Sequence, residues 1–321
     1  MISHPALKNT PYLKEHLKEH SVSMHEALVW GCKPLSRLIS TISRIAGIPV
    51  VRFEDGFLAY QGHPSSGKKR FSLVSDRLGI YYDASCRSEL ESLVIARAAK
   101  SYNREEARRL MSVITNYGIG KYYNSNKSSF VDLRVPHNSV VLIDQVSGDS
   151  SLTFGRAPDD VALMMIDFAF QLTAVSGGEV YLKQHPDILC KKKGKVGIFS
   201  KVEHPKLAHV KLLPSALHTS QITKAFKHVV TATSQFGFES LMAGCEVHCF
   251  GAPFYSHWGI TDDRISFPDI SGRRACTAKA ELLDLFTASY IDYPSYVHPL
   301  TGGLMTLGET LRLIMLEDES E

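Results

Sequence analysis

Three short polar stretches of the sequence contain side chains that could act on a phosphorylated sugar. In Q-V-S-G-D-S-S, Asp149 follows a glycine, and a carboxylate in a cleft can stabilise an oxocarbenium-like transition state or attack an anomeric carbon. In K-Q-H-P, His185 could bind a leaving phosphate or protonate it if its pKa is near neutral. In T-S-Q, Ser234 could present a hydroxyl and backbone N–H groups to an anion at the start of a helix.

Each of these residues also has a purely structural interpretation. Asp149 could cap the turn that follows it, His185 could cap or pack against a neighbouring element, and Ser234 could be an ordinary N-cap. Glu239, one turn into the same predicted helix, could bind the ribose hydroxyls of a nucleotide or simply lie in solvent. Singly these signals are weak, so a site is indicated only because the residues share a position in the fold.

That shared position is the end of a predicted strand. Apolar runs that alternate with helical segments predict strands at 140–143, 179–182, 228–232 and 247–250. Such alternation is typical of a parallel, doubly wound sheet, in which ligands bind beyond the carboxyl ends of the strands. Polar residues or Gly/Pro follow these strands at positions 149, 185, 234 and 253.

An earlier part of the chain predicts a second unit of the same kind. Strands at 26–31 and 49–53 flank a helix at 34–46 whose apolar side chains recur at helical spacing. Those side chains are Leu35, Leu38, Ile39, Ile42 and Ile45. The second strand is followed by Glu54 and Asp55, and either carboxylate could act as the base for an acceptor hydroxyl across a cleft from the other half.

We therefore expect an α/β fold with two Rossmann-like domains that face a cleft, which is a GT-B-like arrangement. Asn, Ser, Gly and Lys residues in the middle of the chain predict the connection between the two domains. The predicted divisions are an N-terminal arm at 1–24, an acceptor-side domain at 25–125, a linker at 126–137, a donor-binding domain at 138–300 and a C-terminal helix at 301–321.

Composition bounds the kind of protein and its location. With 321 residues, 44% hydrophobic and 21% charged, the chain is expected to be globular, with two domains of ordinary size. A net charge of +3 gives no strong field, so no nucleic-acid partner is expected. The six cysteines form no C-x-x-C pair, the N-terminus lacks an apolar signal region, and no apolar run is long enough to span a bilayer. We expect a cytoplasmic location.

Two basic clusters bear on contact with a membrane. The first is Lys68-Lys69-Arg70, and the second contains Lys191, Lys192, Lys193 and Lys195. Either could meet anionic lipid, phosphate or an acidic polysaccharide, although a solvated loop is the simpler interpretation of each. The surface of the inner membrane is therefore a candidate partner.

Six stretches resemble the capsule polysaccharide biosynthesis proteins that include the bacterial β-Kdo transferases. They occur in the order of that family and cover roughly residues 26–300. The resemblance rests on their joint occurrence, because no single stretch is specific. The stretches are R-F-E-D-G-F-L (52–58), L-V-S-D-R-L-G-I-Y-Y-D (73–83), Q-V-S-G-D-S-S-L (145–152), K-Q-H-P-D (183–187), T-S-Q-F-G-F-E-S-L (233–241) and G-A-P-F-Y-S-H-W-G-I-T-D-D (251–263).

The resemblance implies a retaining GT-B-like transferase that moves Kdo from CMP-β-Kdo to a glycolipid or oligosaccharide acceptor in capsule or surface polysaccharide biosynthesis. It implies that Asp149 is the nucleophile of a covalent intermediate and that His185 lies near the CMP phosphate. It further implies that Ser234 contacts the phosphate, Glu239 the cytidine ribose and Glu54 the acceptor. The other matched positions are Gln145, Lys183, Pro186, Thr233, Gly251 and Pro253 for donor binding, and Asp55 and Asp83 for the acceptor side.

No metal or other cofactor is expected for this reaction. CMP carries one phosphate, which Ser234, the helix start after it, and Lys183 or His185 could neutralise. Two other functions stay open: a sugar-nucleotide hydrolase or epimerase on the same scaffold, and a non-catalytic factor of capsule polysaccharide assembly or export. Family members that build the Kdo linker often carry two transferase modules and this chain has one, so capsule assembly proteins are further candidate partners.

Overall fold

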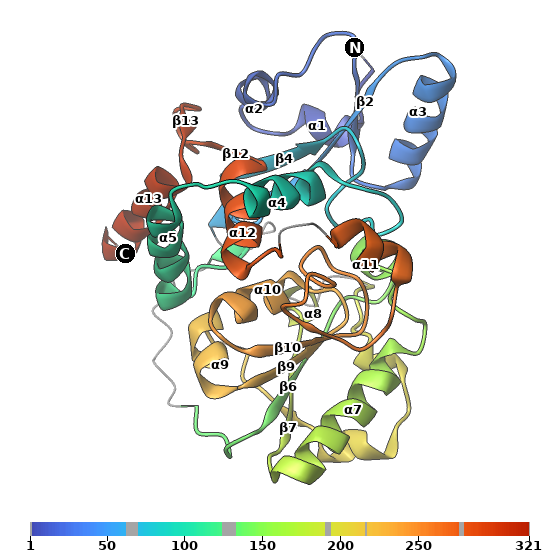
Figure 1. Ribbon diagram of the computed structural model, residues 1–321, viewed down its shortest axis with the longest axis vertical. Coiled ribbons are helices and arrows are strands. Elements are labelled where there is room, and N and C mark those ends of the chain that lie inside the picture. The colour runs from blue at the N-terminus through green and yellow to red at the C-terminus, as the bar shows by residue number, and fades with distance from the viewer. Residues whose placement is uncertain are drawn as a thin grey trace. The chain divides into compact units, whose positions relative to one another are not determined.

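The computed structural model describes residues 2–61, 70–123, 133–189, 194–215, 217–275 and 279–320. The chain forms two compact units, which are described separately below (Figure 1). The first unit comprises Met1–Ile114, Ile119–Asn126 and Leu283–Glu321, and the second comprises Thr115–Gly118 and Lys127–Leu282.

This division differs from the predicted domains at the C-terminal side. The predicted donor-binding domain extends to residue 300, whereas the chain returns to the first unit at Leu283. The reason is that the strand β12 (Pro294–Val297) pairs with a strand of the first unit's sheet. Residues 126–132 of the predicted linker lie outside the described residues, as do Lys68, Lys69 and Lys191 to Lys193 of the basic clusters.

The second unit contains a fully parallel sheet of six strands in the order β11-β10-β9-β6-β7-β8. From β6 the chain moves outward through β7 and β8, then returns to the other side of β6 and continues through β9, β10 and β11, which is the Rossmann order. The doubly wound topology predicted for this half is therefore confirmed. The strands are β6 (Val140–Ile143), β7 (Val180–Lys183), β8 (Lys211–Leu212), β9 (His228–Thr231), β10 (Glu246–Cys249) and β11 (Asp262–Asp263).

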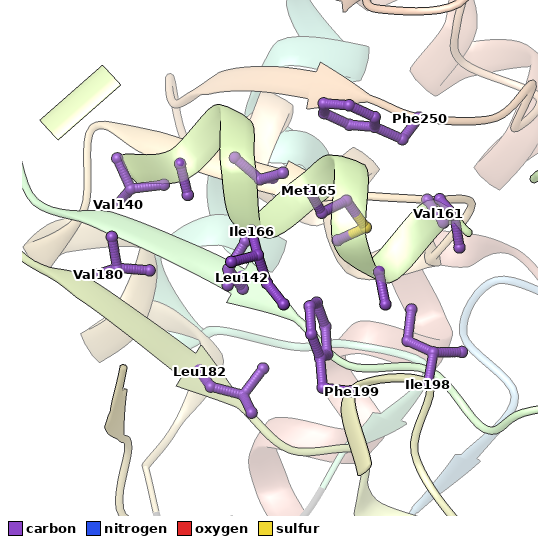
Figure 2. Packing of buried hydrophobic residues seen from close by; sticks show 14 of the residues in the cluster. Val140, Leu142, Val161, Met165, Ile166, Val180, Leu182, Ile198, Phe199 and Phe250 are labelled. Atoms are coloured by element: carbon purple, nitrogen blue, oxygen red, sulfur yellow. The ribbon is translucent and has the colours of Figure 1, made fainter. Parts of the chain in front are cut away.

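Helix α7 (Val161–Ser176) supplies much of the core of this unit. Figure 2 shows Met165 and Ile166 of the helix in one cluster with Leu142 of β6 and Leu182 of β7. All four side chains are buried, and burial of a side chain of this size stabilises a fold by roughly 1.5–3 kcal/mol. The sheet that carries the candidate residues is thus fixed from one face by an almost wholly apolar helix.

Short helices follow the carboxyl ends of several strands of this sheet. α6, α8 and α10 each begin within a few residues of a strand, so their first residues lie at the edge where such sheets bind ligands. The helices of the second unit include α6 (Ser150–Phe154), α8 (Pro186–Leu189), α9 (Thr219–Ala225), α10 (Gln235–Met242), α11 (Pro268–Arg274) and the 3-10 turns η2 (Phe199–Lys201) and η3 (Pro205–His209).

The first unit contains a mixed sheet in the order β1-β2-β4-β12-β13. Only β1 and β2 are parallel, and the other neighbours are antiparallel. The Rossmann-like topology predicted for this half is therefore limited to β1-α3-β2, since β4, the next strand of this sheet, runs antiparallel to β2. The strands are β1 (Ala27–Trp30), β2 (Val50–Asp55), β4 (Ser72–Asp76), β12 and β13 (Leu304–Met305), with a separate parallel pair of β3 (Tyr60–Gln61) and β5 (Tyr122–Tyr123).

The predicted N-terminal arm is a structured part of this unit. Leu7 is fully buried and belongs to the same hydrophobic cluster as Leu28, Val51 and Phe53. The arm therefore contributes to the core, since its apolar side chains pack against those of the sheet. The helices in this part of the chain are α1 (Pro5–Lys8), α2 (Leu13–Glu19), α3 (Pro34–Ile45), α4 (Glu89–Ala99), α5 (Arg104–Tyr117), α12 (Leu282–Phe286), the π-helix η4 (Thr287–Asp292) and α13 (Leu307–Ser320), which is the predicted C-terminal helix.

Helix α3 has the predicted position, and its orientation is one that the sequence analysis did not predict. Ser36, Ser40 and Ser43 are its buried residues, while Ile39 is half-buried and its other large apolar side chains, Leu35, Leu38, Ile42 and Ile45, are exposed. Helical spacing shows that a helix has one apolar face, but it does not show which way that face points. None of the helices formed by the described residues combines the length and hydropathy needed to cross a bilayer.

Candidate active site

A pair of hydrogen bonds joins the carboxyl ends of β6 and β9. The Gln145 amide donates from Nε2 to Thr233 Oγ1 at 3.0 Å and accepts the Thr233 N–H at Oε1 at 2.8 Å. Both residues are buried. β6 and β9 are the neighbouring strands at which the strand order reverses, and the crevice beyond such a point is where α/β sheets bind ligands. Gln145 uses both ends of its amide to hold this edge together, and its predicted role in donor binding stays a prediction.

Two glycines allow the backbone to approach Thr233 closely. A Cβ atom built on Gly251 would lie 2.7 Å from Thr233 Cγ2, and one on Gly155 would lie 2.6 Å from the same methyl carbon. The Ala252 N–H donates to the Gly155 carbonyl at 2.7 Å. Gly251, also predicted on the donor side, is thus required where the segments after β6, β9 and β10 meet.

Asp149 stands at the start of α6, after a glycine in the left-handed conformation (Gly148, φ +77°). Its Oδ1 accepts the Ser151 N–H at 2.8 Å, and its side chain is exposed. The Ser151 hydroxyl in turn lies 3.4 Å from Gln145 Nε2. The capping interpretation of Asp149 is therefore correct as local structure, and the same geometry presents an exposed carboxylate beside the Gln145–Thr233 bridge.

Asp144, directly after β6, has a positioning role that the sequence did not reveal. Burial raises the pKa of its carboxyl to about 6, although hydrogen bonds from the backbone N–H groups of Phe199, Gln145 and Ile198 oppose that shift. A Cβ on Gly197 would collide with this carboxyl group. Asp144 therefore binds the 197–199 segment against the turn that leads to Asp149. The available signal was an aspartate placed directly after an apolar strand.

His185 begins the short helix α8. Its Nδ1 accepts the Asp187 N–H at 3.1 Å, and its carbonyl accepts the Ile188 N–H at 3.0 Å. Pro186 occupies the first position of that helix, where its missing N–H is not needed. With Nδ1 accepting, the proton of the neutral imidazole is on Nε2, so the ring can donate a hydrogen bond to an anion.

Lys183, at the end of β7, lies near the first turn of α10. Its Nζ is 4.8 Å from the centre of the Phe236 ring. Burial lowers the pKa of Lys183, and the nearby Glu239 carboxylate opposes the change by favouring the charged form. Glu239 is itself 8% exposed and accepts a long hydrogen bond from Gln235 Nε2. These two residues, both predicted to bind the donor sugar nucleotide, are therefore close enough for the Glu239 carboxylate to favour the charged form of Lys183.

Ser234 is the N-cap of α10. Its Oγ accepts the Phe236 N–H at 3.2 Å, and its carbonyl accepts the hydroxyl of the fully buried Tyr255 at 2.5 Å. A Cβ on Gly237 would collide with the Tyr255 hydroxyl, so the start of this helix is closely packed. Tyr255 is a positioning residue whose role the sequence did not indicate.

Pro253, after β10, is held by a buried arginine. Arg274 is 3% exposed and donates from Nη1 to the carbonyls of Pro253 and Ser256, both at 2.8 Å. The helix that carries Arg274, α11, was not predicted, and an Arg-Arg pair resembles ordinary surface sequence. Its position could be found only from the fold.

In the first unit, Glu54 forms a separate cluster at the end of β2. The Tyr82 hydroxyl lies 3.4 Å from Glu54 Oε2 and accepts the Cys32 N–H at 3.0 Å. Burial, followed by the neighbouring Asp55 carboxylate, raises the pKa of Glu54 to about 7. Gly31 (φ +49°) leaves room for this arrangement, because a Cβ there would lie 2.6 Å from Glu54 Oε2 and would also collide with the Tyr82 hydroxyl.

The other two predicted acceptor-side carboxylates are engaged with neighbours. Asp55 pairs with Arg70 at 3.0 Å and accepts the Tyr60 hydroxyl at 3.2 Å. Asp83 accepts the N–H and the hydroxyl of Ser85 at 2.9 and 2.5 Å. Glu54, with its pKa raised to about 7, is suited to proton transfer near neutral pH.

The structure thus brings the donor-side candidates together along one edge of the second unit's sheet, and Glu54 with Tyr82 in the first unit. The predicted facing of Glu54 and Asp149 stays a prediction. Among the described residues, no group of three or more His, Cys, Asp or Glu side chains is arranged to hold a metal ion. 

Comparison with known proteins identifies the family. Residues 119–296 match the model of a family described as "Capsule polysaccharide biosynthesis protein". The chain belongs to this family. The matched region covers more than half of the sequence, and it confirms the resemblance found in the motifs.

Two relatives are similar along nearly the whole chain. The capsule polysaccharide modification protein LipA of Neisseria meningitidis is 32% identical over 307 residues, which are 92% of this chain and 42% of LipA. The lipopolysaccharide-processing protein LpsZ of Rhizobium meliloti is 32% identical over 319 residues, which are 96% of this chain and 68% of LpsZ. The chain therefore spans about two fifths of the length of LipA.

Two solved structures share the fold. One is the β-Kdo 2,4 transferase of Thermosulfurimonas dismutans KpsC, with a TM-score of 0.83 and 30% identity over 98% of this chain and 96% of that one. The other is the β-Kdo 2,7 transferase of the same KpsC, with a TM-score of 0.65 and 27% identity over 96% and 90%. These similarities confirm the predicted GT-B-like fold.

Proposed function

We propose that this chain is a glycosyltransferase that moves Kdo from CMP-β-Kdo to a saccharide acceptor in capsule or surface polysaccharide biosynthesis. The observation that carries the proposal is the exposed Asp149 carboxylate beside the Gln145–Thr233 bridge at the switch point of the second unit. The similarity to two β-Kdo transferases of KpsC supports the choice of Kdo as the transferred sugar.

In this proposal the CMP phosphate binds among Ser234, Lys183 and His185. The start of α10 offers N–H groups to an anion, Lys183 adds a cation, and the Nε2 proton of His185 adds a donor. Burial lowers the pKa of Lys183 and the Glu239 carboxylate opposes that change, and Glu239 is a candidate for binding the ribose. These groups would stabilise the negative charge that develops on CMP as it departs.

The proposed chemistry has two steps at the anomeric carbon of Kdo. First, an Asp149 oxygen forms a bond to that carbon, and the bond to the CMP phosphate oxygen breaks with its electron pair leaving on CMP. Next, an acceptor hydroxyl oxygen forms a bond to the same carbon and Asp149 leaves as a carboxylate. The acceptor proton passes to a base, for which Glu54 is the candidate because of its raised pKa. Two displacements give net retention.

The acceptor in this proposal is a glycolipid or oligosaccharide. Because the chain spans about two fifths of LipA, a second transferase module or a capsule assembly protein is a proposed partner rather than an established one. The proposed location is cytoplasmic, at or near the inner membrane, where a lipid-linked acceptor would be found.

Intact-mass analysis tests the proposal most directly. The chain would be incubated with CMP-Kdo generated in situ, with and without an acceptor, and any adduct mapped by peptide sequencing. We expect a Kdo-sized adduct on Asp149 that an acceptor discharges. Product formation with an adduct on another residue would contradict the role of Asp149. Rapid release of free Kdo that no acceptor slows would favour the hydrolase interpretation, and absence of any turnover would favour a non-catalytic assembly factor.

A further inference from the structure

Helix α3 buries its polar face and exposes its apolar face. Ser36 Oγ accepts the Trp30 N–H at 3.1 Å and donates to the Trp30 carbonyl at 2.7 Å, which fixes the helix against β1. Ser40 and Ser43 lie on the same side and are 5% and 0% exposed. The two Ser36 hydrogen bonds to the Trp30 backbone therefore fix the serine side of the helix toward the sheet.

The outward face carries four large apolar side chains in one line. Leu35, Leu38, Ile42 and Ile45 are 42%, 57%, 53% and 83% exposed. Their spacing of three, four and three residues places them on one side of a helix. A contiguous exposed apolar stripe of this kind marks an interaction surface, whereas single exposed apolar residues are ordinary.

The charges around the stripe identify the kind of partner. Lys33, Arg37 and Arg44 are exposed, and the sequence contains no Asp or Glu from Gly31 to Phe53. Arg37 and Arg44 are seven residues apart and so lie along one line of the helix. An apolar stripe flanked by cations alone is typical of helices that lie at the surface of anionic membranes.

We propose that α3 docks the chain on an anionic lipid surface, with the apolar stripe at the boundary of the acyl chains and the arginines at the lipid phosphates. The helix has 12 residues and is therefore about 18 Å long, which is too short to cross a bilayer but sufficient to lie in its interface. A second copy of the chain fits this face poorly, because a symmetric contact would bring Lys33, Arg37 and Arg44 of both copies together without a compensating acid.

Vesicle flotation tests this proposal without donor or acceptor, so its outcome does not depend on the transferase function. The vesicles would contain phosphatidylcholine alone or phosphatidylcholine mixed with phosphatidylglycerol. We expect binding to the mixed vesicles, reduced at least about ten-fold in Leu38→Glu/Ile42→Glu because two apolar contacts are lost. Glu favours helix formation, and circular dichroism would verify that the variant is folded.

The charge and position controls make the test specific. Arg37→Glu/Arg44→Glu should weaken binding to the mixed vesicles by about ten-fold or more and leave any binding to phosphatidylcholine unchanged. Val175→Glu, at an apolar side chain of α7 that is 91% exposed, and Arg109→Glu, at an exposed cation of α5, should have no effect. Equal binding of wild type and Leu38→Glu/Ile42→Glu would overturn the proposal. The proposal would also be overturned if analytical ultracentrifugation showed that the wild type forms an oligomer without lipid and that Leu38→Glu/Ile42→Glu dissociates it, because the stripe would then bind a second copy of the chain.

Discussion

The two units place carboxylates at the ends of strands in contrasting environments. Asp149 of the second unit is exposed and caps a helix, whereas Glu54 of the first unit lies beside Asp55 and Tyr82 with its pKa raised to about 7. An accessible carboxylate on a rigid turn suits attack on a sugar carbon, and a carboxyl with a near-neutral pKa suits proton transfer. Environment, rather than residue type, distinguishes the two proposed roles.

The largest effect is expected where the exposed carboxylate is removed. Asp149→Asn keeps a side-chain oxygen that can cap α6, so the fold and CMP binding should be retained. Transfer should fall at least about 10³-fold, because the amide cannot act as the nucleophile. Single-turnover transfer assays and calorimetric CMP titration would measure the two properties separately. Wild-type turnover by Asp149→Asn would show that Asp149 is not the nucleophile, and the proposed division of roles between Asp149 and Glu54 would then fail.

Asp144 is a buried carboxyl in the segment that leads from β6 to the exposed Asp149. Its folded-state pKa of about 6 exceeds the ordinary 3.8, so the folded protein binds the proton more tightly than the unfolded chain does. The contribution of Asp144 to stability is therefore full below about pH 4 and is lost as the pH rises through 6. The loss is at most about 3 kcal/mol.

Urea denaturation across this pH range would give the free energy of unfolding of wild type and of Asp144→Asn, and the difference between the two would isolate the contribution of Asp144. Wild type alone is not sufficient, because burial lowers the pKa of His16 to about 3 and of His20 to about 4. These two histidines make the folded protein less stable as the pH falls, which opposes the effect of Asp144. A pH-independent difference between the two proteins would show that Asp144 is not the titrating group. Asp144→Asn should keep most of its transfer activity.

One glycine in each unit lies so close to the candidate residues that a side chain would not fit there. Replacing either glycine should lower the free energy of unfolding by an intermediate amount. Gly31→Ala adds a side chain at positive φ against Glu54 and Tyr82, and should cost about 2–4 kcal/mol. Gly251→Ala meets Thr233 and backbone oxygens without positive φ, and should cost about 1–3 kcal/mol. Chemical denaturation would measure both. Gly272→Ala is the control, because nothing lies within 4 Å of its Cβ, and equal stability of all three variants would contradict the close packing.

The sequence predicted the second unit more completely than the first. Parallel strands buried on both faces appear as continuous apolar runs, so β6, β9 and β10 were found, and with them the edge that carries Asp149, Ser234 and Pro253. The first sheet depends on β12, which joins β4 from more than two hundred residues away, and such pairing has no local signal.

Side-chain environments were less predictable than positions in the fold. A glutamine after a strand does not indicate that both ends of its amide will bind Thr233, and nothing near Arg274 in sequence shows that it will hold Pro253. The orientation of α3 was not predictable from the sequence for the same reason. Ser36 contacts the Trp30 backbone of β1 through hydrogen bonds that depend on tertiary structure, whereas periodicity reports only that one face is apolar.

The smallest expected effect tests whether Tyr82 tunes Glu54. Tyr82→Phe removes the hydroxyl near Glu54 Oε2 and the acceptor of the Cys32 N–H, which should cost about 1–2 kcal/mol of stability. Loss of that donor should raise the pKa of Glu54 further, so the acidic limb of the pH–rate profile should move to higher pH. Because the contact is 3.4 Å long, we expect a movement of less than about one pH unit.

Tyr296→Phe is the matched control for this last change. Tyr296 is buried in the same unit, and its hydroxyl donates to the Tyr290 carbonyl at 2.7 Å rather than to a carboxylate. Its loss should therefore lower stability by a similar amount and leave the pH–rate profile in place. If both variants gave the wild-type profile, Tyr82 would not tune Glu54. The raised pKa of Glu54 would then come from burial and the Asp55 carboxylate alone.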